Sequence, residues 1–183
     1  METTNTIKDI EVIAYKGMNS DMTCKGFQYE IGKTYKTDKV KLTEYGFHAC
    51  LNPRNVFGYY PKHNSRYFKV KLSGEITKCD NIDTEVAATE ITILEEIPVD
   101  KLLTNTEWWE NDNVLDLLYW SDGFAKVERT YKEYNFIDKK GKLISDEWFR
   151  CAFSFYKGVA EVQRTNGECC KIDKSGNLIK NLQ

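Results

Sequence analysis

The sequence predicts an α+β fold in which antiparallel β-strands predominate. Three observations carry this prediction: several segments alternate apolar and polar side chains with the period of two that strands require, the helix signals are few and short, and the last third of the chain repeats a β-hairpin pattern. The 183 residues suffice for one ordinary domain or two small ones, and the 13% of aromatic residues can fill the cores of small β-rich units.

A mixed α+β module is expected over residues 8–98. Gly32 interrupts the second of its strands, and Gly74 is expected to turn the chain after the fourth. In chain order, the predicted strands are residues 10–15, 29–35, 46–50, 66–72 and 90–95.

A short helix is expected between the third and fourth strands. Asn52 is a favourable N-cap residue and Pro53 suits the first helical position, so the helix begins there and runs to about Tyr60. Pro61 ends it, because the residue before a proline is held out of the helical region.

A helical linker is expected over residues 99–118. Thr104 followed by Glu107 matches a capping box, in which a hydroxyl and a carboxylate satisfy free N–H groups at a helix start. The predicted helix would continue from there through Trp108 to Leu118.

Residues 119–183 contain one pattern twice, in residues 119–149 and 150–183. When Gly123 is aligned with Gly158, twelve of 22 consecutive positions are identical without a gap. Each copy is expected to contain a strand, a second strand, a turn and a short third strand.

The turn in each copy follows the pattern Asp-Lys-x-Gly. Its aspartate can hydrogen-bond the turn backbone, and its glycine, Gly141 or Gly176, closes the turn. We expect both glycines to have a positive φ, a conformation that only glycine adopts without strain.

The two copies resemble the WG repeat, also written KWG, in which an aromatic residue precedes a glycine-initiated strand and an Ile-Asp-Lys-x-Gly hairpin. The resemblance covers about residues 119–180. Asp122 and Lys157 stand where the family has Trp or another large residue, so Trp120 and Phe155 would only partly replace that anchor. The resemblance implies β-rich interaction or scaffold units without shared catalytic residues.

Composition weighs against several function classes. The formal net charge of −2 gives no basic excess for neutralising nucleic-acid phosphates. No stretch approaches the roughly 18–20 apolar residues of a membrane span, and the first residues carry no export signal. We therefore expect a cytoplasmic protein with no metal site and with reduced thiols. The six cysteines are Cys24, Cys50, Cys79, Cys151, Cys169 and Cys170.

Three blocks of the first module resemble an uncharacterised family found in phage genomes and bacteria. The blocks begin AYKGMNSDM, EYGFHACLN and RYFKVKLSG, and the match covers about residues 12–98. The resemblance brings no agreed activity. It implies a bacteriophage setting, an interaction between virus and host, and a place in the host cell cytoplasm.

The same module is similar to the ADP-ribosyltransferase fold. In that family, a first strand carries Arg or His beside a Gly, a Gly-aromatic strand leads to a helix whose Tyr stacks on nicotinamide, and a late strand carries a catalytic Glu. The late glutamate would be Glu90, Glu95 or Glu96, although no unambiguous Glu-x-Glu pair exists. The residues that match the first two blocks are Tyr15, Lys16, Gly17, Gly46, Phe47, His48, Tyr59 and Tyr60.

These eight residues form the predicted ligand site, and the strands at 15–17 and 46–48 should then lie side by side. The leading hypothesis is non-enzymatic binding of a nucleotide-like ligand or a host protein, which could counter host defence. Lys16 is a poorer bidentate clamp than Arg, which favours binding over catalysis. Two alternatives stay open: an ADP-ribosyltransferase that uses NAD, with Glu90 or Glu95 as catalytic residue, and a structural accessory protein without a ligand.

Plainer interpretations of the site residues also stay open. Lys16 could be a solvated charge at a strand end, and His48 a hydrogen-bonded strand histidine. Tyr59 and Tyr60 could form a stacking platform or lie half in the core and half on the surface.

Overall fold

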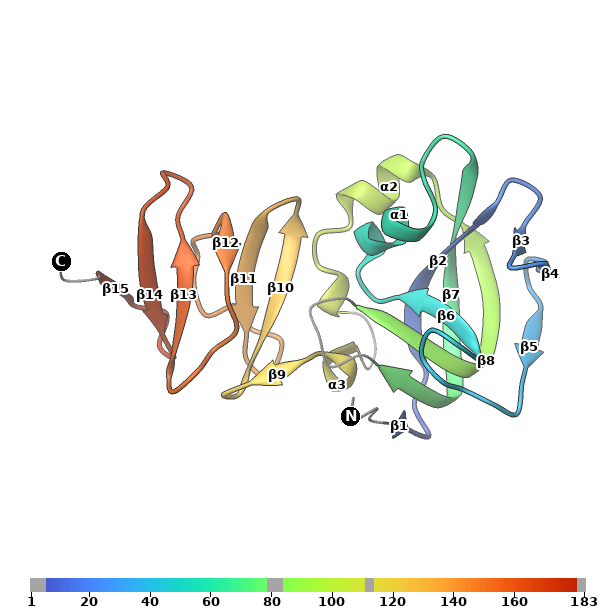
Figure 1. Ribbon diagram of the computed structural model, residues 1–183, viewed down its shortest axis with the longest axis horizontal. Helices are drawn as coiled ribbons and strands as arrows, with labels where there is room; N and C mark the ends of the chain where they lie inside the picture. The colour runs from blue at the N-terminus through green and yellow to red at the C-terminus, as the bar shows by residue number, and fades with distance from the viewer. Residues whose placement is uncertain (1–5, 79–83, 111–113, 181–183) are drawn as a thin grey trace. The chain divides into compact units, whose positions relative to one another are not determined.

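The computed structural model describes residues 6–78, 84–110 and 114–180. The chain divides into two compact units, residues 1–117 and 118–183 (Figure 1). Its helices are short, and every strand pairing among the described residues is antiparallel. The predicted α+β class with predominant antiparallel strands is therefore confirmed.

Unit 1 is built on a six-stranded sheet with the order β1-β7-β2-β6-β8-β5, and β3 and β4 form a separate small hairpin. The strands are β1 (Thr6–Ile7), β2 (Val12–Asn19), β3 (Thr23–Cys24), β4 (Phe27–Gln28), β5 (Thr34–Lys36), β6 (Phe47–Cys50), β7 (Ser65–Lys78) and β8 (Glu85–Glu96).

The sheet of unit 1 closes on itself. The two longest strands, β7 and β8, pair with each other, while β2 pairs with the other edge of β7 and β6 with the other edge of β8. β2 and β6 then meet where Tyr15 pairs with Cys50. The predicted adjacency of the strands at 15–17 and 46–48 is therefore confirmed, although these segments are far apart in the sequence.

Gly74 lies inside β7, where the sequence predicts a turn. It has a φ of 77° and occupies a bulge between Ser73 and Ile76, where the register with β8 shifts. A Cβ at Gly74 would collide with Thr89 Oγ1, a hydroxyl that accepts a 2.9 Å hydrogen bond from the backbone N–H of Glu75. The prediction of a turn is wrong. Glycine is favoured both in turns and in bulges of a continuous strand, so its presence alone does not distinguish the two.

β2 continues four residues past its predicted end at Tyr15, because its backbone pairs with β7 as far as Asn19. Lys16 therefore lies within a central strand, with only 5% of its surface exposed. The interpretation of Lys16 as a solvated strand-end charge is wrong.

The helix predicted after Asn52 is confirmed. Asn52 Oδ1 accepts a 3.0 Å hydrogen bond from the backbone N–H of Arg54, and Pro53 begins a 3₁₀ turn, η1 (Pro53–Asn55). The turn continues as α1 (Val56–Tyr59).

The capping-box prediction at Thr104 is wrong. Thr104 ends a helix, α2 (Val99–Thr104), and its hydroxyl donates back to the carbonyl of Lys101 at 3.1 Å. Threonine hydroxyls satisfy backbone groups at either end of a helix, so the residue alone does not give the direction. The described part of the expected linker helix instead forms η2 (Trp108–Glu110) and α3 (Val114–Leu117).

Unit 2 contains a three-stranded sheet of order β11-β10-β9 and a four-stranded sheet of order β12-β13-β14-β15. The strands are β9 (Trp120–Ser121), β10 (Phe124–Thr130), β11 (Glu133–Ile137), β12 (Cys151–Ala152), β13 (Val159–Gln163), β14 (Cys169–Asp173) and β15 (Leu178–Lys180). The predicted third strand forms in the second copy as β15, whereas the first copy has only a bridge between Ile137 and Leu143.

The two copies of the repeat close with the same turn. Gly141 and Gly176 have φ values of 80° and 84°, which confirms the predicted positive φ. Each glycine N–H donates to the carbonyl of the preceding aspartate, Asp138 or Asp173, at 2.9 and 3.1 Å. The side chain of each aspartate also accepts hydrogen bonds from two backbone N–H groups of its turn.

The two copies of the repeat also share a second turn, at Asp122 and at Lys157. Asp122 and Gly123 have φ values of 53° and 90°, and Lys157 and Gly158 have φ values of 51° and 88°. Two successive positive φ values are those of a type I′ hairpin turn. Asp122 and Lys157 therefore serve the backbone of a tight hairpin, a position for which a large apolar residue is not needed.

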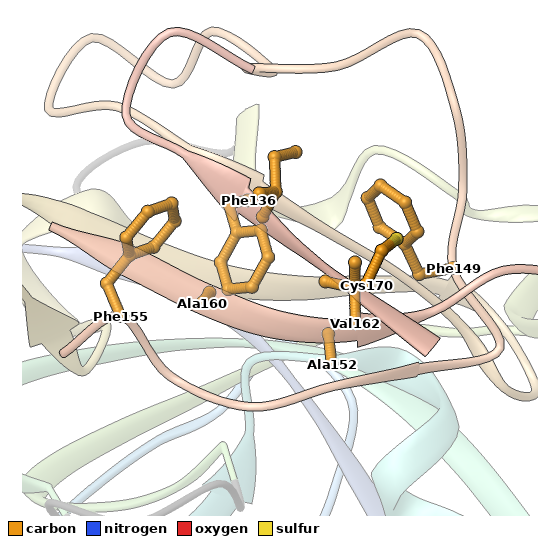
Figure 2. Close-up of a cluster of buried hydrophobic side chains, with 8 residues drawn as sticks. Phe136, Phe149, Ala152, Phe155, Ala160, Val162 and Cys170 are labelled. Carbon is orange, nitrogen blue, oxygen red and sulfur yellow. The ribbon is translucent and has the colours of Figure 1, made fainter. Parts of the chain in front are cut away.

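Both copies contribute to one hydrophobic core in unit 2 (Figure 2). The rings of Phe136, from the first copy, and Phe155, from the second, meet edge to face with centroids 4.9 Å apart. Sharing a core in this way lets repeats that are too small to bury their own faces fold together. The buried members are Phe136, Phe149, Ala152, Phe155, Ala160, Val162, Cys170 and Ile172.

The five cysteines within the described residues are free thiols, and Cys79 lies outside those residues. In the part of the chain that the structure describes, no helix has the length and apolar character needed to cross a membrane.

Candidate functional site

A pocket of about 510 Å³ opens in unit 1, within the size range of small-molecule sites. All eight residues of the predicted ligand site line it. They come from β2, from β6 with the glycine before it, and from the end of α1 with the residue after it. The closure of the sheet between β2 and β6 brings these three segments together.

Lys16 is the buried cation of the pocket. Its Nζ donates a 2.8 Å hydrogen bond to the backbone carbonyl of His48 and lies 5.4 Å from the centroid of the Tyr29 ring. Burial lowers the pKa of Lys16, because the charged amine is removed from water. Cys24 and Cys50 oppose this lowering, and the neighbouring Lys25 adds to it.

Gly17 allows the Tyr60 ring to lie directly on the backbone of β2. A Cβ at Gly17 would approach Tyr60 Cβ to 2.6 Å and Tyr60 Cγ to 2.7 Å, closer than carbon atoms can pack. The backbone of Tyr60 is held from two sides: its N–H donates to the carbonyl of Val56 at 2.9 Å, and its carbonyl accepts from the Tyr67 hydroxyl at 2.7 Å. The ring is thus a positioned wall of the pocket.

His48 carries a buried ring nitrogen with an unused hydrogen-bonding capacity among the described residues. Burial, and to a lesser degree Lys16 and Lys25, lower the pKa of His48 to about 4, so the ring is neutral near pH 7. Hydrogen bonding to the carbonyls of Gly46 and Lys41 acts in the opposite direction. Nε2 is buried and has no hydrogen-bond partner within the described residues. The ring proton therefore belongs on Nδ1, which leaves the Nε2 lone pair available to accept.

A cluster of aromatic rings forms the wall near β6. Phe27 packs edge to face on Tyr29 and on Phe47, with ring centroids 4.8 and 6.1 Å apart. Tyr35 extends the cluster behind Phe27, with centroids 5.2 Å apart. Burial raises the pKa of both Tyr29 and Tyr60, so their hydroxyls stay protonated at physiological pH.

Sequence reasoning missed nine of the residues that line the pocket. The hairpin of β3 and β4 contributes three of them, and Tyr29 directly follows it. The aromatic pair Phe27 and Tyr29 in the string CKGFQYE is the sequence signal at this place. The nine are Cys24, Lys25, Phe27, Tyr29, Thr43, Ala49, Cys50, Val56 and Glu85.

The glutamates expected for a transferase lie outside the pocket lining. Glu90 accepts a 2.8 Å hydrogen bond from Lys36, and Glu95 lies 3.8 Å from the amine of Lys69. Glu96 is bound by the guanidinium of Arg66. The glutamate that does line the pocket is Glu85, at the start of β8. Among the described residues, no group of three or more His, Cys, Asp or Glu side chains is placed to hold a metal ion.

Comparison with known proteins gives one match. Residues 12–105 match the model of a family described as "Domain of unknown function (DUF7666)". No curated protein and no solved structure matches the chain. The matched segment covers half of the chain and includes β2 to α2, with every segment that lines the pocket. The chain therefore belongs to the DUF7666 family.

Proposed function

We propose that unit 1 is a non-enzymatic binding module for a flat, nucleotide-like small molecule. The observation that carries this proposal is the pocket itself, where three segments distant in the sequence bring together the buried Lys16 amine, aromatic rings and His48, whose Nε2 has no partner among the described residues. Polar groups that lack partners in a pocket are the groups that a ligand satisfies.

The polar groups are complementary to the edge of a heteroaromatic ring. The Lys16 amine donates, and His48 Nε2 accepts, so a ligand with an adjacent acceptor and donor would satisfy both. Adenine and the carboxamide of nicotinamide both offer such a pair. The rings of Tyr29 and Tyr60 supply faces on which a planar base can stack.

Binding is favoured over group transfer. Glu90 and Glu95 are engaged by lysines away from the pocket, so neither is placed to orient a ribose inside it. Lys16 offers a single point charge without the planar fork of an arginine, which suits capture of a ligand better than a bidentate clamp on a phosphate.

Isothermal titration calorimetry with NAD, ADP-ribose and cyclic nucleotides tests the proposal. We expect at least one of these ligands to bind the wild-type chain with a dissociation constant below 1 mM. Stacking on an aromatic side chain contributes about 1–3 kcal/mol per base, so Tyr60→Ala should weaken binding about tenfold or more. Lys16→Ala should also weaken it, because His48 O and the ligand lose a donor.

Glu90→Gln is the matched control, since Glu90 lies on β8 but outside the pocket lining. It should leave the affinity unchanged. If no ligand of the panel binds below 1 mM, or if Glu90→Gln weakens binding as much as Tyr60→Ala, the pocket does not have this function. Protein binding by the repeats of unit 2 would then be the hypothesis to pursue.

The proposal includes a cytoplasmic setting, in the host cell if the chain serves a phage. Cys24 and Cys50 line the pocket, and a reducing compartment would keep cysteines as thiols. Labelled NAD incubated with a cell extract separates the binding module from a transferase, which would pass label to a protein.

A further inference from the structure

The amine of Lys16 has features that simple binding does not require. It is buried in an apolar pocket, and within the described ranges no carboxylate lies at ion-pair distance from it. Its Nζ donates to the backbone carbonyl of His48, lies beside the Tyr29 ring and also interacts with the side chain of Cys24. A lysine kept for stability alone would be expected to reach solvent or a carboxylate.

The surroundings of Lys16 make its amine easier to deprotonate than the amine of an exposed lysine. Burial lowers its pKa, and Lys25, on the β3–β4 hairpin, lowers it further. A neutral lysine amine in a desolvated site next to a second cation is a nucleophile towards carbonyl carbon. The titratable groups that line the pocket with it are Cys24, Lys25, Tyr29, His48, Cys50, Tyr59, Tyr60, Tyr15 and Glu85.

We propose that the pocket takes a ligand that carries an aldehyde or ketone, and that Lys16 Nζ joins its carbonyl carbon as a Schiff base. The inference rests on the proposed function in that the same pocket holds the ligand.

The step balances without an oxidant or reductant. The Nζ lone pair adds to the carbonyl carbon, and a proton moves from nitrogen to the former carbonyl oxygen. A second proton, taken from solvent, converts that hydroxyl to water, which leaves as the protonated carbon–nitrogen double bond forms. The protonated imine keeps one N–H, which can still donate to the His48 carbonyl. The positive charge then lies beside the face of the Tyr29 ring, which attracts cations.

The carbonyl can come from two sources, a free aromatic aldehyde or the reducing sugar of a nucleotide. We would incubate the full chain separately with pyridine-3-carbaldehyde, with ADP-ribose, whose terminal ribose opens to an aldehyde, and with NAD, which has no free aldehyde. Sodium borohydride then reduces any imine to a stable secondary amine. Intact mass and peptide mapping locate the adduct.

We expect one adduct, at Lys16, with pyridine-3-carbaldehyde or ADP-ribose and none with NAD. The rate of labelling should reach half its maximum at a lower pH than is usual for a lysine, whose ordinary pKa is about 10.4. An adduct with only one of the two carbonyl ligands also supports the inference and identifies the source. Adducts only on other lysines, or on none, would overturn it.

Lys16→Met keeps the apolar stem and removes the amine, whereas Lys69→Met removes an amine outside the pocket lining. The adduct should disappear in the first variant and persist in the second. Peptide mapping of the wild-type chain still locates or excludes the adduct at Lys16 if Lys16→Met does not fold. Nucleotide binding without an adduct would support the proposed function and overturn the Schiff-base inference. An adduct at Lys16 without nucleotide binding would support the Schiff-base inference and overturn the proposed function.

Discussion

Replacing Gly17 by alanine tests the packing on which the pocket depends. The Cβ of alanine would lie 2.6 Å from Tyr60 Cβ, whereas carbon atoms in favourable contact lie about 3.5–4.0 Å apart. The Tyr60 side chain must therefore retreat by roughly 1 Å. Its backbone resists, since it is tied to Val56 and to the Tyr67 hydroxyl. Inserting one methyl group into a tightly packed contact costs about 1–3 kcal/mol, so we expect Gly17→Ala to lower the free energy of unfolding by about 2 kcal/mol.

Urea unfolding followed by circular dichroism measures this loss. The matched control is Gly58→Ala in α1, where an added Cβ meets no atom within 4 Å. Alanine is the better helix former by about 0.5–1 kcal/mol, so this variant should be unchanged or slightly more stable. Gly17 lies in a strand and is not one of the glycines with a positive φ. A loss of stability in Gly17→Ala therefore reports the contact with Tyr60 and not backbone strain.

A double-mutant cycle isolates the contact. Tyr60→Gly removes the Cβ and the ring that alanine at position 17 would strike, so Gly17→Ala should cost little in that background. The reasoning would be refuted if Gly17→Ala were within about 0.5 kcal/mol of wild type, or if its cost were the same with and without the Tyr60 side chain.

Three further predictions follow from the same geometry. Gly176→Ala should destabilise unit 2 more than Gly167→Ala. Both glycines have a positive φ, but of the two only Gly176 has a backbone carbonyl, that of Ile144, in the space that a Cβ would take. Equal thermal unfolding temperatures of the two variants would contradict this prediction. His48 has its pKa lowered to about 4 in the fold, so the unfolded chain takes up its proton first as the pH falls, and the free energy of unfolding should decline between about pH 6.5 and pH 4. Solvent screening at the half-buried ring reduces that decline in the free energy of unfolding to about 2 kcal/mol, and His48→Gln should remove the decline. If the stability of His48→Gln falls with pH as steeply as that of the wild-type chain, His48 is not the cause. Glu90→Gln should leave ligand affinity within twofold of wild type by calorimetry, and a tenfold loss would place this carboxylate in the site.

The sequence was informative wherever local chemistry determines local structure. Asn52 caps the helix that was predicted from it, and Gly141 and Gly176 close matching turns because only glycine adopts their φ without strain. Arg129 and Arg164 occupy the same position of the two repeats, and each pairs with the glutamate four residues later. These features depend on neighbours within a few residues, so pattern and propensity suffice to find them.

The misses concern features that depend on distant partners. Gly74 bends a strand because Thr89 on the facing strand occupies the space beside it. The hairpin that brings Cys24 to the pocket consists of two strands of two residues each, so its sequence signal is limited to the aromatic pair Phe27 and Tyr29. The family resemblance placed a glutamate on a late strand but did not show which glutamate lines the pocket. The strand register and the closure of the sheet decide this, and they bring Glu85 to the pocket, which the sequence analysis missed.

The central claim is that unit 1 holds a flat, nucleotide-like ligand between β2, β6 and the end of α1. Amide NMR spectra of the ¹⁵N-labelled full chain, recorded during titration with ADP-ribose, NAD and cyclic nucleotides, test it most directly. The account predicts that the ligand which binds shifts the resonances of residues 15–17, 23–29, 46–48 and 59–60 in a saturable way, while residues 120–180 of unit 2 stay unchanged. Saturable shifts confined to unit 2, or no saturable shift with any member of the panel, would contradict it.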